Sequence, residues 1–292
     1  MDRFVNAVLA GISEGATYGL VALGIVLVYK ATRVLNFAQA EIATYSLYLV
    51  WLMTEPPLNI PVFPAVIIGL IIAGFAGGAT EVILRPLSAA PRLTVTVATL
   101  GLAFGLGAAQ VVQFGPDPHP LPALISGEAF VIARIPFNWG RVLALIITLG
   151  LGIALYLFFK RTLFGLGVLA AAQDQNALKL QGVPYNRVSI FTWSTGAMLT
   201  ALAAMILAPA IGSFTPLWVT QTFLVPSLAA ALVGGLTSLP GAFVGGLVVG
   251  VAQNLAKFYL GRDLGGAEFA AVFAAILLVL LLRPHGLLGK EA

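Results

Sequence analysis

Three carboxylates lie within stretches of this sequence that are otherwise apolar, and they are the first candidates for chemistry. They are Glu14, Glu41 and Glu81. An ionisable group inside a membrane span is costly, so by default it indicates a functional site. Glu81 stands four residues before Arg85, and this spacing predicts a structural ion pair at the membrane edge. Glu14 could face a partner helix or a pore, and the sequence leaves both open.

Glu41 ends a polar segment, 36–41, at the start of an apolar stretch. It either lines a transport pathway or lies near the cytoplasmic interface, and the polarity of the segment favours the interface. Asn36 and Gln39 belong to the same segment and are pathway candidates with it. Hydroxyl side chains in spans usually bond to their own helix. The hydroxyl candidates for the pathway are Thr96, Thr99 and Thr195.

The sequence does not support catalysis. His119 and His285 are the only histidines, and each stands beside a proline. HExxH, GxSxG and GxxxxGK[ST] patterns are all missing, and the absence of Cys excludes thiolate nucleophiles and thiolate metal sites. We therefore predict no catalytic, metal-binding or cofactor-binding residues. Such a membrane protein is either a passive channel or depends on ATP hydrolysis by another subunit.

The composition indicates an integral membrane protein. Hydrophobic residues make up 60% of the chain and charged residues only 9%, whereas soluble domains carry about 25% charged residues. No polar linker interrupts the pattern, so we expect a single transmembrane domain, 1–292, with an all-α polytopic fold. Eight or nine spans of roughly 20 residues are expected, some short or broken. They lie near 7–29, 35–53, 61–84, 94–114, 141–159, 189–212, 223–237, 239–256 and 267–283.

The region 223–256 is interrupted by glycines and Pro240, and we expect two tilted half-length helices there. Irregular backbone at membrane depth must be buried in protein or line a watery cavity. Gly241 and Gly245 therefore join the pathway candidates.

Basic residues predict the orientation. If 160–188 faces the cytoplasm, ten basic residues lie on that side and five on the other, as the positive-inside rule requires. The net charge of +4 then concerns topology and not nucleic acid. The N-terminus lies outside, the C-terminus inside, and the proline-rich loop 115–140 forms an ordered external cap or docking surface. The two sets are Lys30, Arg33, Arg85, Arg92, Lys160, Arg161, Lys179, Arg187, Arg283 and Lys290, against Arg3, Arg134, Arg141, Lys257 and Arg262.

The most polar internal stretch, 160–188, predicts a short amphipathic helix outside the bilayer. Residues 170–181 are rich in good helix formers, Gly182 stands where a helix would end, and Pro184 follows. Asp174, Gln175 and Lys179 would lie on the more exposed face. The small, apolar docking face would comprise Ala170, Ala171, Ala177, Leu178 and Leu180.

Residues 176–182 resemble the cytoplasmic coupling loop of ATP-binding-cassette (ABC) importer permeases, whose pattern is Glu-Ala-Ala-x-x-x-Gly. Asn176 stands in place of the Glu, and Gly182 matches the Gly. The whole chain is similar to the LivH-type permeases of high-affinity branched-chain amino acid importers. The matching segments are 15–24, 33–41, 85–93, 234–242 and 283–287.

This resemblance implies the membrane subunit of an importer for branched-chain or other small amino acids in a bacterial inner membrane. It implies two ATPase subunits, which bind ATP and Mg²⁺, and a periplasmic or lipid-anchored binding protein. A second, related permease chain is implied, with a heterodimer favoured over a homodimer. Asn176, Leu166 and Leu169 stand where the family often has charges, so docking would depend more on apolar fit. The alternative function is a standalone channel or secondary carrier for small polar solutes such as urea or amides.

Overall fold

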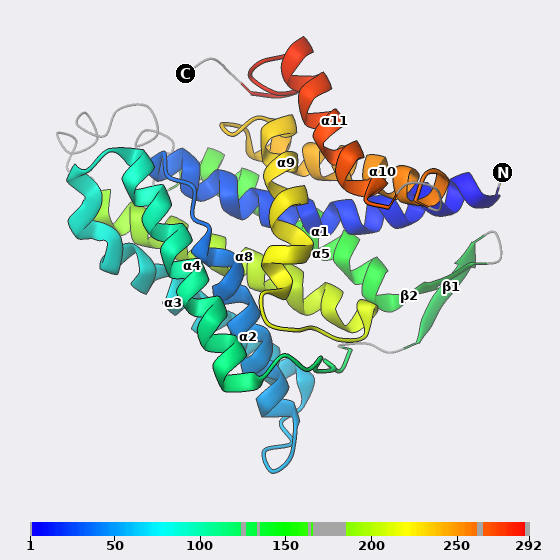
Figure 1. Ribbon diagram of the computed structural model, residues 1–292, viewed down its shortest axis with the longest axis horizontal. Helices are drawn as coiled ribbons and strands as arrows, with labels where there is room; N and C mark the ends of the chain where they lie inside the picture. Colours follow the sequence, from blue (N-terminus) through cyan, green and yellow to red (C-terminus); the bar gives the residue numbers. More distant parts are fainter. Residues whose placement is uncertain are drawn as a thin grey trace.

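The computed structural model describes residues 2–123, 127–132, 135–162, 165, 185–261 and 265–289. These residues form nine α-helices and one β-hairpin (Figure 1). In chain order the helices are α1 (Asp2–Thr32), α2 (Ala38–Thr54), α3 (Val62–Leu84), α4 (Arg92–Phe114), α5 (Trp139–Arg161), α8 (Tyr185–Ile211), α9 (Val225–Gly234), α10 (Leu239–Tyr259) and α11 (Ala267–Leu282).

Each expected span has a helix in its place, and the predicted all-α polytopic membrane fold is confirmed. Within the described part of the chain, five helices are long and apolar enough to cross a membrane. Two further apolar segments are shorter, Thr220–Gly234 and Ala267–Leu282. The first combines a π-helical turn, η2 (Thr220–Leu224), with α9, and a 3₁₀ turn, η1 (Arg85–Ala89), joins α3 to α4.

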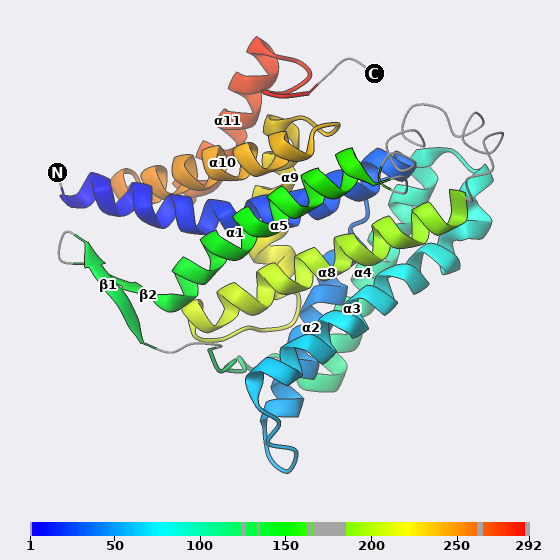
Figure 2. The ribbon, with the colours of Figure 1, turned by 180° about the vertical axis from the view of Figure 1, so that it is seen from behind.

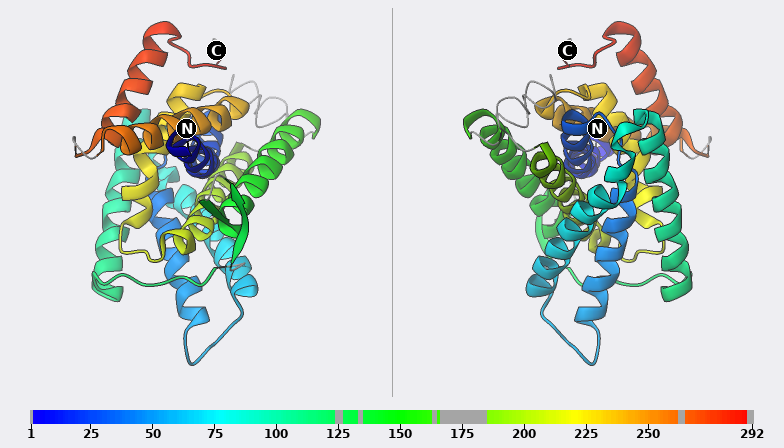
Figure 3. Two further views of the ribbon diagram at one scale, coloured as in Figure 1. Left: turned by 90° about the vertical axis from the view of Figure 1, so that its right-hand side faces the viewer. Right: turned by 90° about the vertical axis from the view of Figure 1, so that its left-hand side faces the viewer.

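Helix α1 is the centre of the bundle. It lies between α9 on one side and α5 on the other (Figures 1 and 2), and it is seen almost end on in Figure 3. Glycines let α10 lie directly on it. A Cβ atom added at Gly11 would come within 2.6 Å of the Val251 Cα, and one at Gly15 within 2.6 Å of the Gly246 carbonyl oxygen. Because van der Waals contact drives helix association in lipid, this close approach stabilises the pair.

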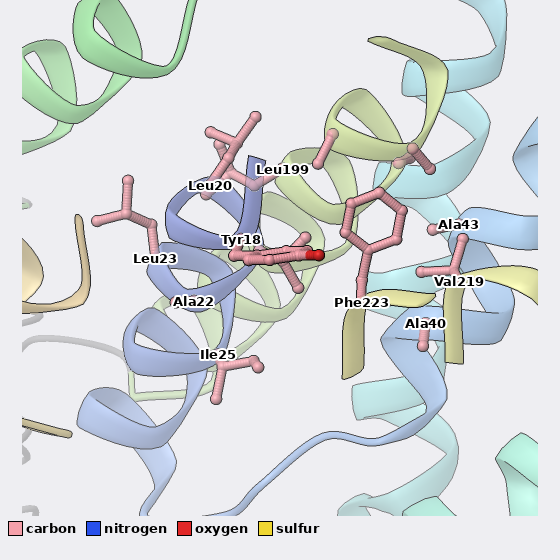
Figure 4. Close-up of a cluster of buried hydrophobic side chains, with 14 of the residues drawn as sticks. Tyr18, Leu20, Ala22, Leu23, Ile25, Ala40, Ala43, Leu199, Val219 and Phe223 are labelled. Atoms are coloured by element: carbon pink, nitrogen blue, oxygen red, sulfur yellow. The ribbon is translucent and has the colours of Figure 1, made fainter. Parts of the chain in front are cut away.

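Aromatic rings fill the space between α1 and η2 (Figure 4). The Tyr18 ring meets the Phe223 ring edge to face, with 6.0 Å between centroids, and Trp218 meets Phe223 from another side at 5.4 Å. Leu199 of α8 and Ala43 of α2 close the same cluster. The core therefore joins segments from both halves of the sequence.

The prediction of two half-length helices in 223–256 is wrong for α10, which has 21 residues. Pro240 lies in the first turn of α10, where its missing N–H costs no helical hydrogen bond. The Ser238 hydroxyl caps this turn by accepting a hydrogen bond from the Gly241 nitrogen at 3.1 Å. Pro240 and Gly241 therefore mark the start of a full-length helix and do not break a span. Helix α9, with 10 residues, is short as expected.

The loop 115–140 contains no helix among its described residues until Trp139, as expected. Strands β1 (Glu128–Ile132) and β2 (Ile135–Asn138) pair antiparallel, with Ile132 opposite Ile135. Backbone hydrogen bonds of 2.9 Å in both directions tie His119 to Phe214, which follows α8. The loop is thus tied to the segment after α8 at His119, and its role as an external cap or docking surface stays a prediction.

Candidate functional site

The polar segment 36–41 enters the bundle interior. After α1 ends, the chain runs unwound to the start of α2 (Figure 1), where Thr99 of α4 holds it. The Thr99 hydroxyl lies 3.0 Å from the Leu35 carbonyl oxygen and accepts a hydrogen bond from the Phe37 nitrogen at 3.2 Å. Asn36 and Gln39 are buried here, and the described residues offer their side-chain amides no hydrogen-bond partner.

Glu41 is fully buried and connects three elements. Its Oε2 accepts a hydrogen bond from Gln110 Nε2 of α4 at 2.9 Å, and its Oε1 accepts one from the Thr220 hydroxyl of η2. Gln110 also accepts a hydrogen bond from the nitrogen of Leu217 at 3.0 Å, and Leu217 itself has a left-handed backbone with a φ of 61°. The carboxylate therefore links α2 and α4 to the irregular chain before α9 and is buried within the bundle. Whether it lines a pathway or lies near the cytoplasmic interface stays a prediction.

The other pathway candidates lie on α4, α8 and α10. The Thr96 hydroxyl donates to the Arg92 carbonyl of its own helix, and Thr195 is half-buried on α8. A Cβ atom at Gly241 or Gly245 would collide with backbone carbonyls of α9, so these glycines act in helix packing. Their role in a pathway stays a prediction.

The predicted pair between Glu81 and Arg85 is confirmed. Arg85 Nη2 lies 2.6 Å from Glu81 Oε2. The pair borders a cavity of about 250 Å³ at one end of the bundle, which Arg92, Tyr185 and Trp193 also line.

Glu14 faces a partner helix, which is one of the two alternatives left open by the sequence, and it also lines a cavity. Its position on a pore stays a prediction. Its Oε2 accepts a hydrogen bond from Asn254 Nδ2 of α10 at 2.9 Å. The cavity has a volume of about 310 Å³ and lies between α1, α8, η2, α10 and α11. It is lined by Glu14, Tyr18, Leu207, Ile211, Gln221, Thr222, Gln253, Lys257, Glu268 and Phe269.

Sequence reasoning missed most of this cavity. Gln253 and Lys257 are polar positions near the end of an apolar helix, and Glu268 is an acidic residue in the first turn of α11. Their polarity within apolar segments is a usable signal for a site, whereas the positive-inside rule uses Lys257 only to predict topology. The predicted coupling residues lie outside the described residues; they are Ala170, Ala171, Asp174, Asn176, Ala177, Leu178, Leu180 and Gly182.

A family model and full-length relatives of this chain point to the same protein family. Residues 7–282 match the family model described as "Branched-chain amino acid transport system / permease component". The chain is 29% identical to the high-affinity branched-chain amino acid transport system permease protein BraD of Pseudomonas aeruginosa, over 99% of this chain and 96% of that protein. It is 27% identical to LivH of Escherichia coli, with 98% and 96% covered.

Among solved structures, PsaBC from Streptococcus pneumoniae in complex with Fab is similar at 15% identity, with a TM-score of 0.47 over 96% of this chain and 91% of that one. The family match and the full-length relatives agree with the helical membrane bundle. The chain therefore belongs to the permease family of branched-chain amino acid ABC transport systems, whose subunits span the membrane without catalytic activity or a cofactor of their own.

Proposed function

We propose that this chain carries branched-chain or other small amino acids inward, driven by ATPase subunits that dock on its coupling segment. The observation that carries this is the π-helical turn η2, which contributes to both polar sites, the buried carboxylate of Glu41 and the cavity at Glu14. Thr220 bonds to Glu41, while the next residues, Gln221 and Thr222, line the cavity at Glu14. π-Helical turns occur frequently at functional sites, and a turn shared by two polar sites can couple them.

The distribution of basic residues supports a cytoplasmic location for one end of the bundle. Arg85 and Arg92 line the same cavity as Tyr185, the first residue of α8, and α5 ends with Lys160 and Arg161. By the positive-inside rule this end faces the cytoplasm, so the N-terminus is outside and the C-terminus inside.

Cysteine labelling tests this orientation, because the natural chain has no Cys. Ser88 and Glu55 are exposed at opposite ends of α3. In intact cells, a membrane-impermeant maleimide should label a Glu55→Cys variant and spare a Ser88→Cys variant until the membrane is opened. The reverse pattern would overturn the orientation.

The proposed coupling segment lies between α5 and α8. ATP-driven closure of two ATPases, which bind ATP and Mg²⁺, would move the segments 170–182 together and rock the spans between outward-open and inward-open states. A second, related permease chain completes the pathway, and a binding protein delivers the amino acid to the outer face.

Affinity purification from the native membrane, followed by leucine uptake in proteoliposomes, tests the function. We expect an ATPase and a second permease to co-purify, and uptake to require ATP. A chain that purifies alone and transports small polar solutes without ATP would instead establish the channel or carrier alternative.

A further inference from the structure

The cavity at Glu14 combines charges of both signs with an apolar wall. Glu14 and Glu268 are acidic and Lys257 is basic, and all three line a space of about 310 Å³. Small-molecule sites usually measure about 300–1,000 Å³, so this one suits a small ligand. Acidic and basic groups at one small site match a zwitterion better than a neutral solute.

The acidic side of the cavity offers hydrogen-bond acceptors. Besides the two carboxylates, the Oε1 atom of Gln253 is buried and has no hydrogen-bond partner among the described residues. A buried acceptor without a partner costs free energy, and a ligand donor removes that cost. An ammonium group carries three donors and no acceptor, which complements this set.

Lys257 forms the basic side. It lies one turn beyond Gln253 and Asn254 on α10, and the described part of the chain gives it no ion-pair partner. Its ammonium group can pair with a ligand carboxylate. The amide of Gln221 and the hydroxyl of Thr222, both from η2, are further donors within the same lining.

The remaining wall is apolar. Leu207 and Ile211 end α8, and Phe269 begins α11. An aliphatic side chain placed against these residues would bury exposed apolar surface of Ile211 and Phe269.

We propose that this cavity is a binding site for a zwitterionic aliphatic α-amino acid on its way through the membrane. Its ammonium group faces Glu14, Glu268 and Gln253, its carboxylate faces Lys257, and its side chain contacts Leu207, Ile211 and Phe269. The inference rests on the proposed amino acid transport and adds where this chain recognises the cargo. A urea or amide molecule would leave the charged groups of the cavity unpaired, so the site rejects such solutes.

Protection from a thiol reagent tests occupancy directly. In the complete transporter in proteoliposomes, a Thr222→Cys variant is treated with methanethiosulfonate ethylammonium from the outer side. We expect leucine to slow modification at least several-fold, while isovalerate and isoamylamine, which each lack one of the two charges, protect much less. A Glu55→Cys variant, exposed on the loop before α3, is the control and should react equally with and without leucine.

Transport kinetics give a second readout. Lys257→Gln and Glu268→Gln should each raise the KM for leucine about tenfold, the size expected when one charge-assisted hydrogen bond is lost. Lys257→Arg keeps the charge, so its KM for leucine should remain close to that of the unchanged protein. Glu55→Gln removes a charge outside the cavity and should leave the KM for leucine unchanged.

The failures of the two proposals are distinguishable. If the unchanged complex takes up leucine with ATP, but leucine does not protect Thr222→Cys and both neutral variants keep the normal KM, the cavity assignment is wrong and the transport function stands. If the unchanged complex takes up no amino acid at all, the proposed function itself fails, and the site falls with it.

Discussion

Gln110 on α4 holds the carboxylate of Glu41 on α2, with 2.9 Å between Gln110 Nε2 and Glu41 Oε2. The same amide group uses its oxygen to accept a hydrogen bond from the Leu217 nitrogen. One side chain thus satisfies a buried charge and a backbone donor in irregular chain, both of which would otherwise be costly. This arrangement explains how the chain at Leu217, just before η2, is held against α2 and α4.

Replacement of Gln110 by Leu should destabilise the protein by about 2–4 kcal/mol, since it removes a donor from a buried carboxylate and an acceptor from the half-buried Leu217 nitrogen. Thermal unfolding of the purified chain in detergent measures the effect. Thr96→Val is the matched control on α4, because Thr96 bonds only to its own helix backbone, and its effect should be small. Equal melting temperatures for the two variants would contradict the role assigned to Gln110.

Replacement of Gly250 by Leu should prevent normal packing of α10 on α1. A Cβ atom at Gly250 would collide with the backbone of Gly11 and Gly15, and overpacking costs about 1–3 kcal/mol or more where backbone must move. The yield of folded protein in the membrane and its thermal stability are the measurements.

Gly101→Leu is the matched control for this change. Gly101 is exposed on α4, and an added Cβ atom there would meet nothing within 4 Å. We expect it to fold normally in the isolated chain. A Gly250→Leu protein as stable as the Gly101→Leu protein would show that the contact between α1 and α10 tolerates extra volume.

In the coupling segment, Ala177→Asp or Gly182→Glu should uncouple transport. Each would place an unpaired charge against the ATPase, and a buried unpaired charge costs several kcal/mol of docking free energy, on the order of 3–5. Co-purification of the ATPase and ATP-dependent leucine uptake should both fall. Lys179→Gln, predicted on the exposed face, serves as the control; unchanged co-purification and uptake in the Asp and Glu variants would refute the coupling assignment.

Local properties of the sequence were sufficient for the helices. A span is a run of apolar residues long enough to cross the bilayer. The positions of the nine helices in the described part of the chain could therefore be predicted without knowing which segments pack together. The ion pair between Glu81 and Arg85 was predictable for the same reason, since both residues lie on adjacent turns of one segment. The error at α10 arose because Pro240 and its neighbouring glycines signal a helix start as readily as a break.

The polar sites were decided by tertiary structure alone. Glu41 meets partners 69 and 179 positions away, and Glu14 meets one 240 positions away. No local pattern encodes such pairings, because they depend on which helix faces pack together. The sequence by itself thus determined a bundle of membrane helices with costly carboxylates inside it. Only the packing of α1 against α10, and of α4 and η2 against α2, decided which groups satisfy those carboxylates and where a cavity remains.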